Sequence, residues 1–494
     1  MMRLSRFFLT LVLALAALAA RAQALGYEDA RHLLDRTGFG ATDAEVRAFA
    51  NLTREAAVDR LLDGARRESV TAPPDFVRDP IVPYRKVRDM SAEERMAFRR
   101  TLVEQGLELR AWWIGEMLAT PSPLTERMTL FWHNHFATSQ QKVRFSQLMY
   151  GQNVLLRREA LGNFATMLHG IAKDPAMLVW LDNARSRREA PNENFAREVM
   201  ELFTLGEGHY GERDVKEAAR AFTGWSLQPA TARFVYRAAW HDDGDKTVLG
   251  KQGALDGDQV LDLLLARPET AEHIARKLWL EFVSPEPDAA EVSRWARIFR
   301  DSRYEVKPLM RAVLLSRAFW AADNRGTLVK SPVDLVVGTM HTFGVAPADL
   351  RPAAVATALL GQNLFAPPNV KGWTGGDAWI DSATLLGRRQ FVQRVFFRAP
   401  AQPQAMRAPQ ADAMTSVQAT RAKAEPGVRL RAILERGFGA YAFDAAHWQG
   451  PIAHDAATRL DALVLAIPPV STPAAAAGIE RLQALVADPA YQLR

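Results

Sequence analysis

The sequence contains no cysteine. It has one apolar run near its start, which is too short to span a bilayer comfortably, and no second run is long enough to do so. A chain without cysteine forms no disulfide and carries no thiol chemistry. Also absent are the Gly-x-Ser-x-Gly elbow, the phosphate-binding loop, the dinucleotide-binding glycine motif, the haem-attachment motif and zinc-finger cysteine spacings. Stability must therefore come from burial of apolar side chains, and a hydrophobic share of 48% supplies enough of them.

The N-terminus has the pattern of a secretory signal peptide. Arg3 and Arg6 precede an apolar run over residues 7–20, and Ala22-Gln23-Ala24 then matches an A-x-A cleavage site. We predict a signal peptide over 1–24 and a periplasmic or secreted protein with no stable membrane span; an uncleaved N-terminal anchor is the alternative. Removing 1–24 takes away three arginines and no acid, so the formal net charge falls from +6 to +3, which argues against nucleic acid as a partner.

Most of the remaining chain has the apolar spacing of amphipathic helices, so we predict a mainly α fold. Capping boxes at Thr42–Glu45, Ser91–Glu94 and Asp214–Glu217 predict helix starts. The one β signal is a hairpin formed by residues 233–236 and 247–249 across an Asp-Asp-Gly-Asp turn. Further helices are expected at 144–160, 164–172, 193–205, 215–223, 258–266, 269–282, 288–300, 308–318, 332–343 and 353–361.

The composition predicts one large helical domain followed by a less regular C-terminal part. The main multi-helix domain is expected over 26–398, with the small β-hairpin near 233–249 inserted in it. Residues 399–426 are rich in Ala, Pro, Gln and Arg and have little apolar periodicity, which is typical of a linker. Residues 427–494 are expected to form a small or partly ordered appendage.

The most informative stretch is 191–205, in which polar residues share one face of the expected helix. Asn194, Arg197, Glu198 and Glu201 fall at i, i+3, i+4 and i+7 and therefore form a polar stripe. Two carboxylates, an amide and a guanidinium can hold a cation or an anionic substrate, and Asn192 precedes them. The structural alternative is that Asn192 is an N-cap and that Arg197 neutralises Glu201.

Two other segments offer candidate metal ligands. His133 and His135 lie in a Trp-His-Asn-His-Phe cluster; on a regular helix they face different ways, but both can reach one metal from a helix end. The alternative is hydrogen-bonded imidazoles within an aromatic core. Asp182 follows an apolar segment, and together with Glu201 it provides oxygen ligands suited to a hard divalent cation.

Two loops complete the set of candidate residues. His241 and Asp242 stand in a run of titratable side chains at the expected hairpin tip, where a loop can carry them into a cleft; an ordinary Asp-Gly turn is the alternative. Lys371 and Trp373 end a proline-containing loop that starts at Gly361 and could grip a sugar or a carboxylated chain. A structural strap with Trp373 as a core plug is the simpler alternative.

Several blocks taken together resemble a known bacterial family, catalogued as domain of unknown function 1800 (DUF1800). The resemblance covers roughly 28–395 and implies a largely helical, often exported protein, commonly encoded beside a second uncharacterised family that resembles sulfatases and alkaline phosphatases. It brings no catalytic residue with it, and the segment after about 400 is expected to lie outside it. The blocks are His32–Leu34, Arg36–Gly40, Phe131–Phe136, Asn192–Glu198, Glu201–Gly206, Ala221–Trp225, His241–Asp242, Lys330–Pro332 and Pro367–Trp373.

Two functions are consistent with these patterns. The first is an exported, metal-assisted enzyme that acts on an envelope or extracellular polymer, with Glu198 or Asp242 as general acid/base aided by His241. Its substrate would contact Asn192, Asn194, Arg197, Lys371 and Trp373, and its divalent cation would be held by His133, His135, Asp182 and Glu201. The second is a non-catalytic binding or assembly module that recruits an exported, sulfatase-like partner. The enzyme requires these distant residues to meet around one pocket.

Overall fold

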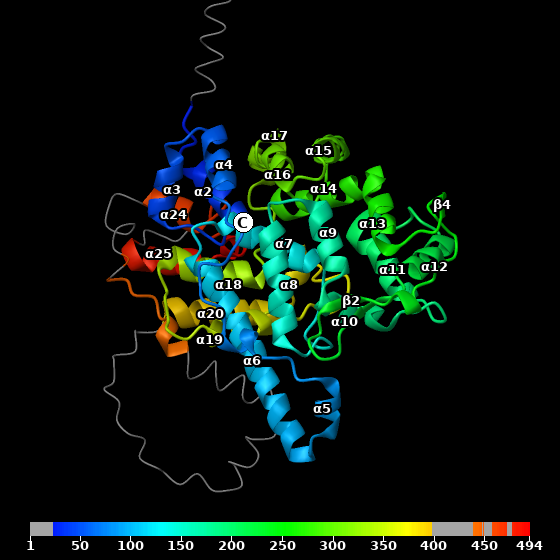
Figure 1. Ribbon diagram of the computed structural model, residues 1–494. Helices are drawn as coiled ribbons and strands as arrows, with labels where there is room; N and C mark the ends of the chain where they lie inside the picture. Colours follow the sequence, from blue (N-terminus) through cyan, green and yellow to red (C-terminus); the bar gives the residue numbers. More distant parts are fainter. Residues whose placement is uncertain (1–22, 398–437, 447, 449–456, 472–476) are drawn as a thin grey trace, which may run out of the picture.

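Figure 1 shows the computed structural model of the protein, which describes residues 23–397, 438–446, 448, 457–471 and 477–494. The described part is mainly α-helical, as predicted. Residues 1–22 of the expected signal peptide and the expected linker at 399–426 lie outside the described residues, and both remain predictions.

The helices follow the predicted segments closely. The segments expected at 164–172 and 332–343 are helices with those bounds, α9 and α18. In chain order the α-helices are α2 (Tyr27–Thr37), α3 (Asp43–Ala50), α4 (Arg54–Asp63), α5 (Tyr84–Asp89), α6 (Ala92–Ala119), α7 (Pro123–His135), α8 (Ser146–Glu159), α9 (Phe164–Ala172), α10 (Pro175–Trp180), α11 (Glu193–Met200), α12 (Glu212–Ala221), α13 (Gly257–Ala266), α14 (Pro268–Phe282), α15 (Ala289–Asp301), α16 (Val306–Leu314), α17 (Arg317–Trp320), α18 (Pro332–Phe343), α19 (Arg351–Leu359), α20 (Ser382–Phe396), α24 (Ala457–Val464) and α25 (Gly478–Ala487).

Short helical turns join several of these helices. One of them is a π-helical turn, η3 (Glu201–Leu205), which continues α11 without a break and so divides the single helix expected over 193–205. The other turns are 3-10 helices: η1 (Asp75–Arg78), η2 (Asn183–Arg185), η4 (Ala238–Trp240), η5 (Ala322–Asn324), η6 (Gly376–Trp379), η7 (Phe438–Tyr441) and η8 (Pro489–Gln492).

Two of the three predicted capping boxes begin helices. Thr42 caps α3 and Ser91 caps α6, each with the expected glutamate three residues later. The third prediction is wrong, because α12 begins at Glu212 and its N-cap is Gly211. Asp214 stands at the third helical position, where its carboxylate accepts a hydrogen bond from the backbone N–H of Gly211.

The predicted hairpin near 233–249 is wrong in its pairing, although both of its strands exist. β2 (Phe234–Tyr236) pairs antiparallel with β1 (Trp225–Leu227), and β3 (Lys246–Val248) pairs with β4 (Lys251–Gly253). Each strand therefore pairs with a neighbour on its other side in the sequence. The acidic turn between β2 and β3 separates two small hairpins and does not close one.

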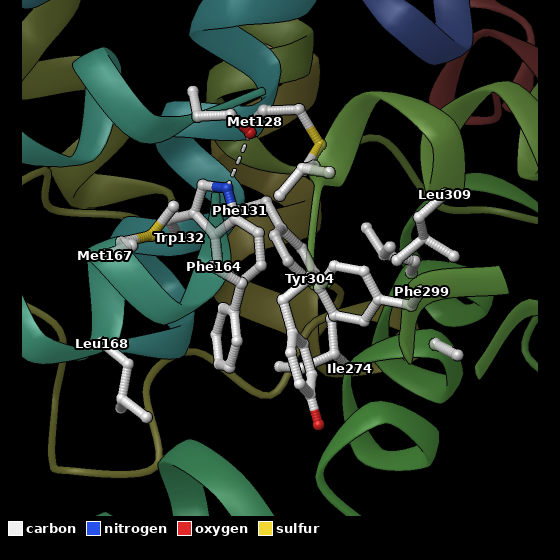
Figure 2. Close-up of a cluster of buried hydrophobic side chains, with 14 of the residues drawn as sticks. Met128, Phe131, Trp132, Phe164, Met167, Leu168, Ile274, Phe299, Tyr304 and Leu309 are labelled. Atoms are coloured by element: carbon white, nitrogen blue, oxygen red, sulfur yellow. Dashed lines mark hydrogen bonds between the residues drawn. The ribbon is translucent and has the colours of Figure 1, made fainter. Parts of the chain in front are cut away.

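The larger hydrophobic core lies under α7, α9 and α14–α16. Figure 2 shows its centre, where Trp132 of α7 packs beside Phe164 of α9 and Tyr304 closes the cluster from the other side. The Trp132 indole donates a hydrogen bond of 2.9 Å to the carbonyl oxygen of Ala160. The C-terminal end of α7, which carries His133 and His135, is therefore anchored in the core.

A second core joins α6, α18, α19 and α20 to the C-terminal helices. Leu482 and Leu485 of α25 are fully buried in it, as is Tyr441. Phe443 packs against the rings of Phe343 and Phe396. The described segments after 437 thus share a core with the main body. In the described part of the chain, no helix is both long and apolar enough to cross a membrane.

Candidate functional site

The candidate site lies where the end of α7 meets the loop at 361–373 and the π-helical turn η3. His133 accepts a hydrogen bond at Nε2 from the backbone N–H of Phe365, at 3.1 Å. Its ring is buried among Trp113, Phe365 and Trp373. Burial lowers the pKa of His133 to about 3, so the ring is neutral near pH 7 and carries its proton on Nδ1. His133 therefore holds the loop in place.

Asn134 binds the same loop at its other end. Its side-chain Oδ1 accepts from the backbone N–H of Trp373 at 2.7 Å, and its Nδ2 donates to the Trp373 carbonyl at 3.2 Å. Gly372 has a φ of +80°, and a Cβ there would lie 2.6 Å from the Asn134 carbonyl oxygen and closer still to Oδ1. Only glycine fits this contact. Trp373 is buried, so the alternative of a core plug is confirmed and its role as a substrate contact is not supported.

His135 supports the π-helical turn. Its Nε2 donates to the carbonyl oxygen of Phe203 at 3.2 Å, and its Nδ1 accepts from the ammonium of Lys277 at 3.0 Å. His273 donates to the neighbouring carbonyl of Leu202 at 3.1 Å. Burial lowers the pKa of His135 well below its usual value, that of His273 to about 4 and that of Lys277 to about 8. The two imidazoles thus satisfy backbone carbonyls of the π turn, and Lys277 holds His135 from its other side.

Glu198 and Glu201 lie at the junction between α11 and this turn. Glu198 is half-buried and, within the described part of the chain, has no hydrogen-bond or ion-pair partner. Its burial and the charge of Glu201 raise its pKa, while Lys371 and Arg197 act in the opposite direction. Glu201 accepts a hydrogen bond from the hydroxyl of Tyr210. The structure thus brings together Glu198, Glu201, Arg197 and Lys371, and it adds Tyr210, for which the sequence offered no signal.

The remaining polar residues of the 192–201 stripe are used locally. Asn192 is the N-cap of α11, and its Nδ2 donates to the Leu181 carbonyl at 2.6 Å, so both ends of its side chain are occupied. Arg197 does not neutralise Glu201 but forms two hydrogen bonds with Glu212, at 2.6 and 2.8 Å. Asn194 is exposed in the first turn. The N-cap interpretation of Asn192 is confirmed, and its assignment to substrate binding stays a prediction.

His241 and Asp242 belong to a different part of the molecule. His241 donates from Nδ1 to the Thr223 carbonyl at 2.9 Å. Asp242 accepts two hydrogen bonds from Arg220, at 2.7 and 3.0 Å, and this contact lowers its pKa. Their contacts join the loop to α12 and do not reach the carboxylates of α11. Both side chains thus hold the loop, and their catalytic assignment stays a prediction.

The four predicted metal ligands do not form one centre. Asp182 is exposed and pairs with Lys142 at 2.6 Å, while Glu201 is bound by Tyr210 and the two histidines hold backbone groups on opposite sides of α7. No group of three or more such side chains with the geometry of a metal site occurs among the described residues. The prediction is wrong because each ligand meets a nearer partner.

Comparison with known proteins gives one match. The sequence model of a family described as protein of unknown function (DUF1800) matches residues 32–493, so the chain belongs to this family. The match continues to 493, which corrects our expectation that the family ends near 395. No curated protein and no solved structure matches the chain.

Proposed function

We propose that this DUF1800 protein is an exported acid–base enzyme that cleaves an envelope or extracellular polymer, with Glu198 as its general acid. The single observation that carries the proposal is the state of Glu198: a half-buried carboxyl with a raised pKa, no polar partner among the described residues and a second carboxylate three residues away. A raised pKa keeps a carboxyl protonated closer to neutral pH, which is what proton donation to a leaving group needs.

The surroundings of Glu198 fit this chemistry. Glu201 is held as a hydrogen-bond acceptor by Tyr210 and is available to take a proton from water. Lys371 provides a positive charge from the loop that His133 and Asn134 hold in place. In the proposed hydrolysis, water adds to the scissile centre, Glu201 takes its proton and Glu198 gives one to the leaving oxygen.

A pair of glutamine variants tests this proposal. Glu198→Gln keeps the shape of the side chain but cannot donate a proton, so we expect product release from a purified envelope polymer such as peptidoglycan to fall about 100-fold or more. Glu193→Gln, on the exposed first turn of the same helix, is the matched control and should retain activity. Equal activities of the two folded variants would contradict the assignment. Wild-type activity should also fall as pH rises through the raised pKa of Glu198.

The helix pair α5–α6 favours a second candidate function. Figure 1 shows this pair projecting from the body, and Val103 and Met96 on α6 are 70% and 55% exposed. Met96 and Val103 are seven residues apart and therefore lie on one face of the helix, where they could contribute to a protein contact. We propose, as the alternative, that this arm recruits an exported partner resembling sulfatases.

This alternative is tested with the purified partner. Val103→Glu should abolish its co-elution with the protein, because a buried unpaired charge opposes association. Glu93→Gln, at an exposed position in the first turn of the same helix, is the control. Wild-type protein that does not co-elute with the partner would refute the recruitment, and this result leaves the test of Glu198 unaffected.

A further inference from the structure

A charged cavity lies between α2, α18, α24 and the C-terminal residues, away from the α11 carboxylates. Its empty volume is about 390 Å³, counting the solvent at its opening, and the part that water-sized molecules can occupy is small. Figure 1 shows α2, α24 and α25 gathered on this side of the molecule. The charged and polar side chains that line the cavity are Arg31, Asp35, Lys330, Asp334, Tyr491 and Arg494.

Both carboxylates at the cavity are already used by arginines. Asp334 accepts from Arg127 and from the backbone N–H of Ser331, and it lies 3.3 Å from Nε of Arg494. Asp35 lies 2.6 Å from Arg31. Each carboxylate is thus paired with an arginine within the protein, and the charges of both also act on Lys330, whose pKa they raise against the effect of burial.

The cations at the cavity are not balanced in the same way. Lys330 has no ion pair within the described residues; its ammonium lies 4.0 Å from the ring centre of Tyr491, and burial lowers its pKa to about 8. Nη1 of Arg494 and Nε of Arg31 are buried without a hydrogen-bond partner. Unpaired buried donors and an unpaired ammonium are costly unless a ligand satisfies them.

Charged side chains just outside the cavity lining add to its positive charge. Arg36 and Arg388 are fully buried near the cavity, and their charges act on Arg494 and Lys330 respectively. Glu281 is the only added carboxylate in this group, and it is taken by Arg127 and Arg494. Nine charged side chains thus lie in or next to the cavity. Six are cationic, namely Arg31, Arg36, Arg127, Lys330, Arg388 and Arg494, and three are anionic, namely Asp35, Glu281 and Asp334. An anion in the cavity would offset this excess.

We propose that this cavity binds a tetrahedral inorganic oxyanion, phosphate or sulfate, held by Lys330 and the free donors of Arg31 and Arg494. Guanidinium and ammonium groups bind such oxyanions through short charge-assisted hydrogen bonds. The small room in the cavity fits an ion of this size and excludes a large organic ligand. The bound ion would join α2 to the segment before α18 and to the C-terminal residues, so its binding would stabilise the packing of the C-terminal part.

Titration calorimetry and thermal unfolding test this proposal with sodium phosphate and sodium sulfate in separate arms, at low millimolar concentration and constant ionic strength in chloride. We expect at least one oxyanion to bind and to raise Tm, since a ligand of the native state stabilises it. Lys330→Gln should weaken that binding at least tenfold. Lys251→Gln, which removes the same charge from an exposed strand, is the matched control.

The outcomes separate specific binding from a general salt effect. Lys330→Gln should be at least as stable as the wild type in chloride, because it removes an unpaired buried charge. Equal Tm increases in wild type, Lys330→Gln and Lys251→Gln would show exclusion of the salt from the surface and overturn the proposal. Wild-type protein that binds neither ion would also overturn it, whether or not the variant folds. Glu198→Gln should keep the full response, because the two sites are separate.

Discussion

The α11 carboxylate site and the charged cavity use similar residue types in opposite surroundings. At the carboxylate site, Arg197 pairs with Glu212 on the next helix, and both side chains are substantially exposed. At the cavity, Arg127 pairs with Asp334 from far along the chain, and both are almost fully buried. The exposed pair contributes little free energy, because water solvates both groups almost as well as they solvate each other. The buried pair is shielded from water, so each charge depends on its partner.

This difference determines what each region can do. Exposed pairs are easily exchanged for a substrate. Glu198 is half-buried and has no ion-pair partner among the described residues, so it can change its protonation state without unfolding the protein. Buried pairs fix the positions of helices, since a partner left alone carries the full cost of a desolvated charge. We therefore expect stability to depend on the cavity region and chemistry to depend on the carboxylate site.

The largest expected effect is at the buried pair. Arg127→Ala leaves Asp334 without its closest partner and should lower the free energy of unfolding by about 3–5 kcal/mol, measured by urea denaturation. The double variant Arg127→Leu with Asp334→Leu should cost less than Arg127→Ala alone, because it leaves no unpaired charge. Wild-type stability of Arg127→Ala would show that the buried pair contributes no more to stability than the exposed pair does.

The next effect concerns the loop that carries Lys371. Gly372→Ala forces a Cβ against Asn134 at a positive φ and should cost about 2 kcal/mol or more. Gly376→Ala is the control in the same segment, because it also has a positive φ but has no atom within 4 Å of the added Cβ. Its cost should be about 1 kcal/mol, from backbone strain alone. Similar costs for both variants would mean that the Asn134 contact does not hold the loop.

The third expectation is a pH dependence that arises beside the carboxylate site. The pKa of His133 is about 3 in the folded protein and 6.5 as a free side chain, so between these values only the unfolded state binds the proton. Its contribution to stability is therefore complete above pH 6.5 and falls by about 1.4 kcal/mol per pH unit as the pH drops toward 3. Denaturation of His133→Gln from pH 4 to 7 should show a slope smaller by this amount, and an unchanged slope would refute a neutral buried His133.

The smallest effect should be at the exposed pair. Arg197→Ala should leave the urea midpoint unchanged within error, because the ion pair with Glu212 is solvated and screened by salt. Measurement beside Arg127→Ala under the same conditions compares the two regions directly. A loss as large as that of the buried pair would show that Arg197 holds α11 in place.

The sequence predicted the helical framework well but paired the strands wrongly. α9 and α18 have the predicted bounds because apolar spacing and capping act within one element. The strand at 233–236 was recognised, but its partner β1, which has the same length of three residues and follows α12, was not. Pairing depends on contacts that strand propensity does not describe.

The candidate site was predicted in part. Glu198 and Glu201 share the expected face because helical spacing places them there, whereas the approach of Lys371 depends on contacts with His133 and Asn134. The sequence identified the two histidines as important but proposed metal binding, whereas in the structure they contact backbone groups. Residue type alone does not reveal which atom a ring nitrogen will contact. The cavity was missed entirely, because Arg31, Lys330 and Arg494 come from three distant segments with no shared pattern.

The sequence by itself determined the fold class, most helix positions, the absence of thiol chemistry and the resemblance to the DUF1800 family. These follow from local spacing and from the residues present, which remain the same whatever the chain packs against. The tertiary structure alone decided which charges are neutralised, which imidazoles stay neutral and which cations remain unpaired. Those properties depend on burial and on distances of a few ångströms between residues far apart in the chain, because electrostatic energies change steeply with both.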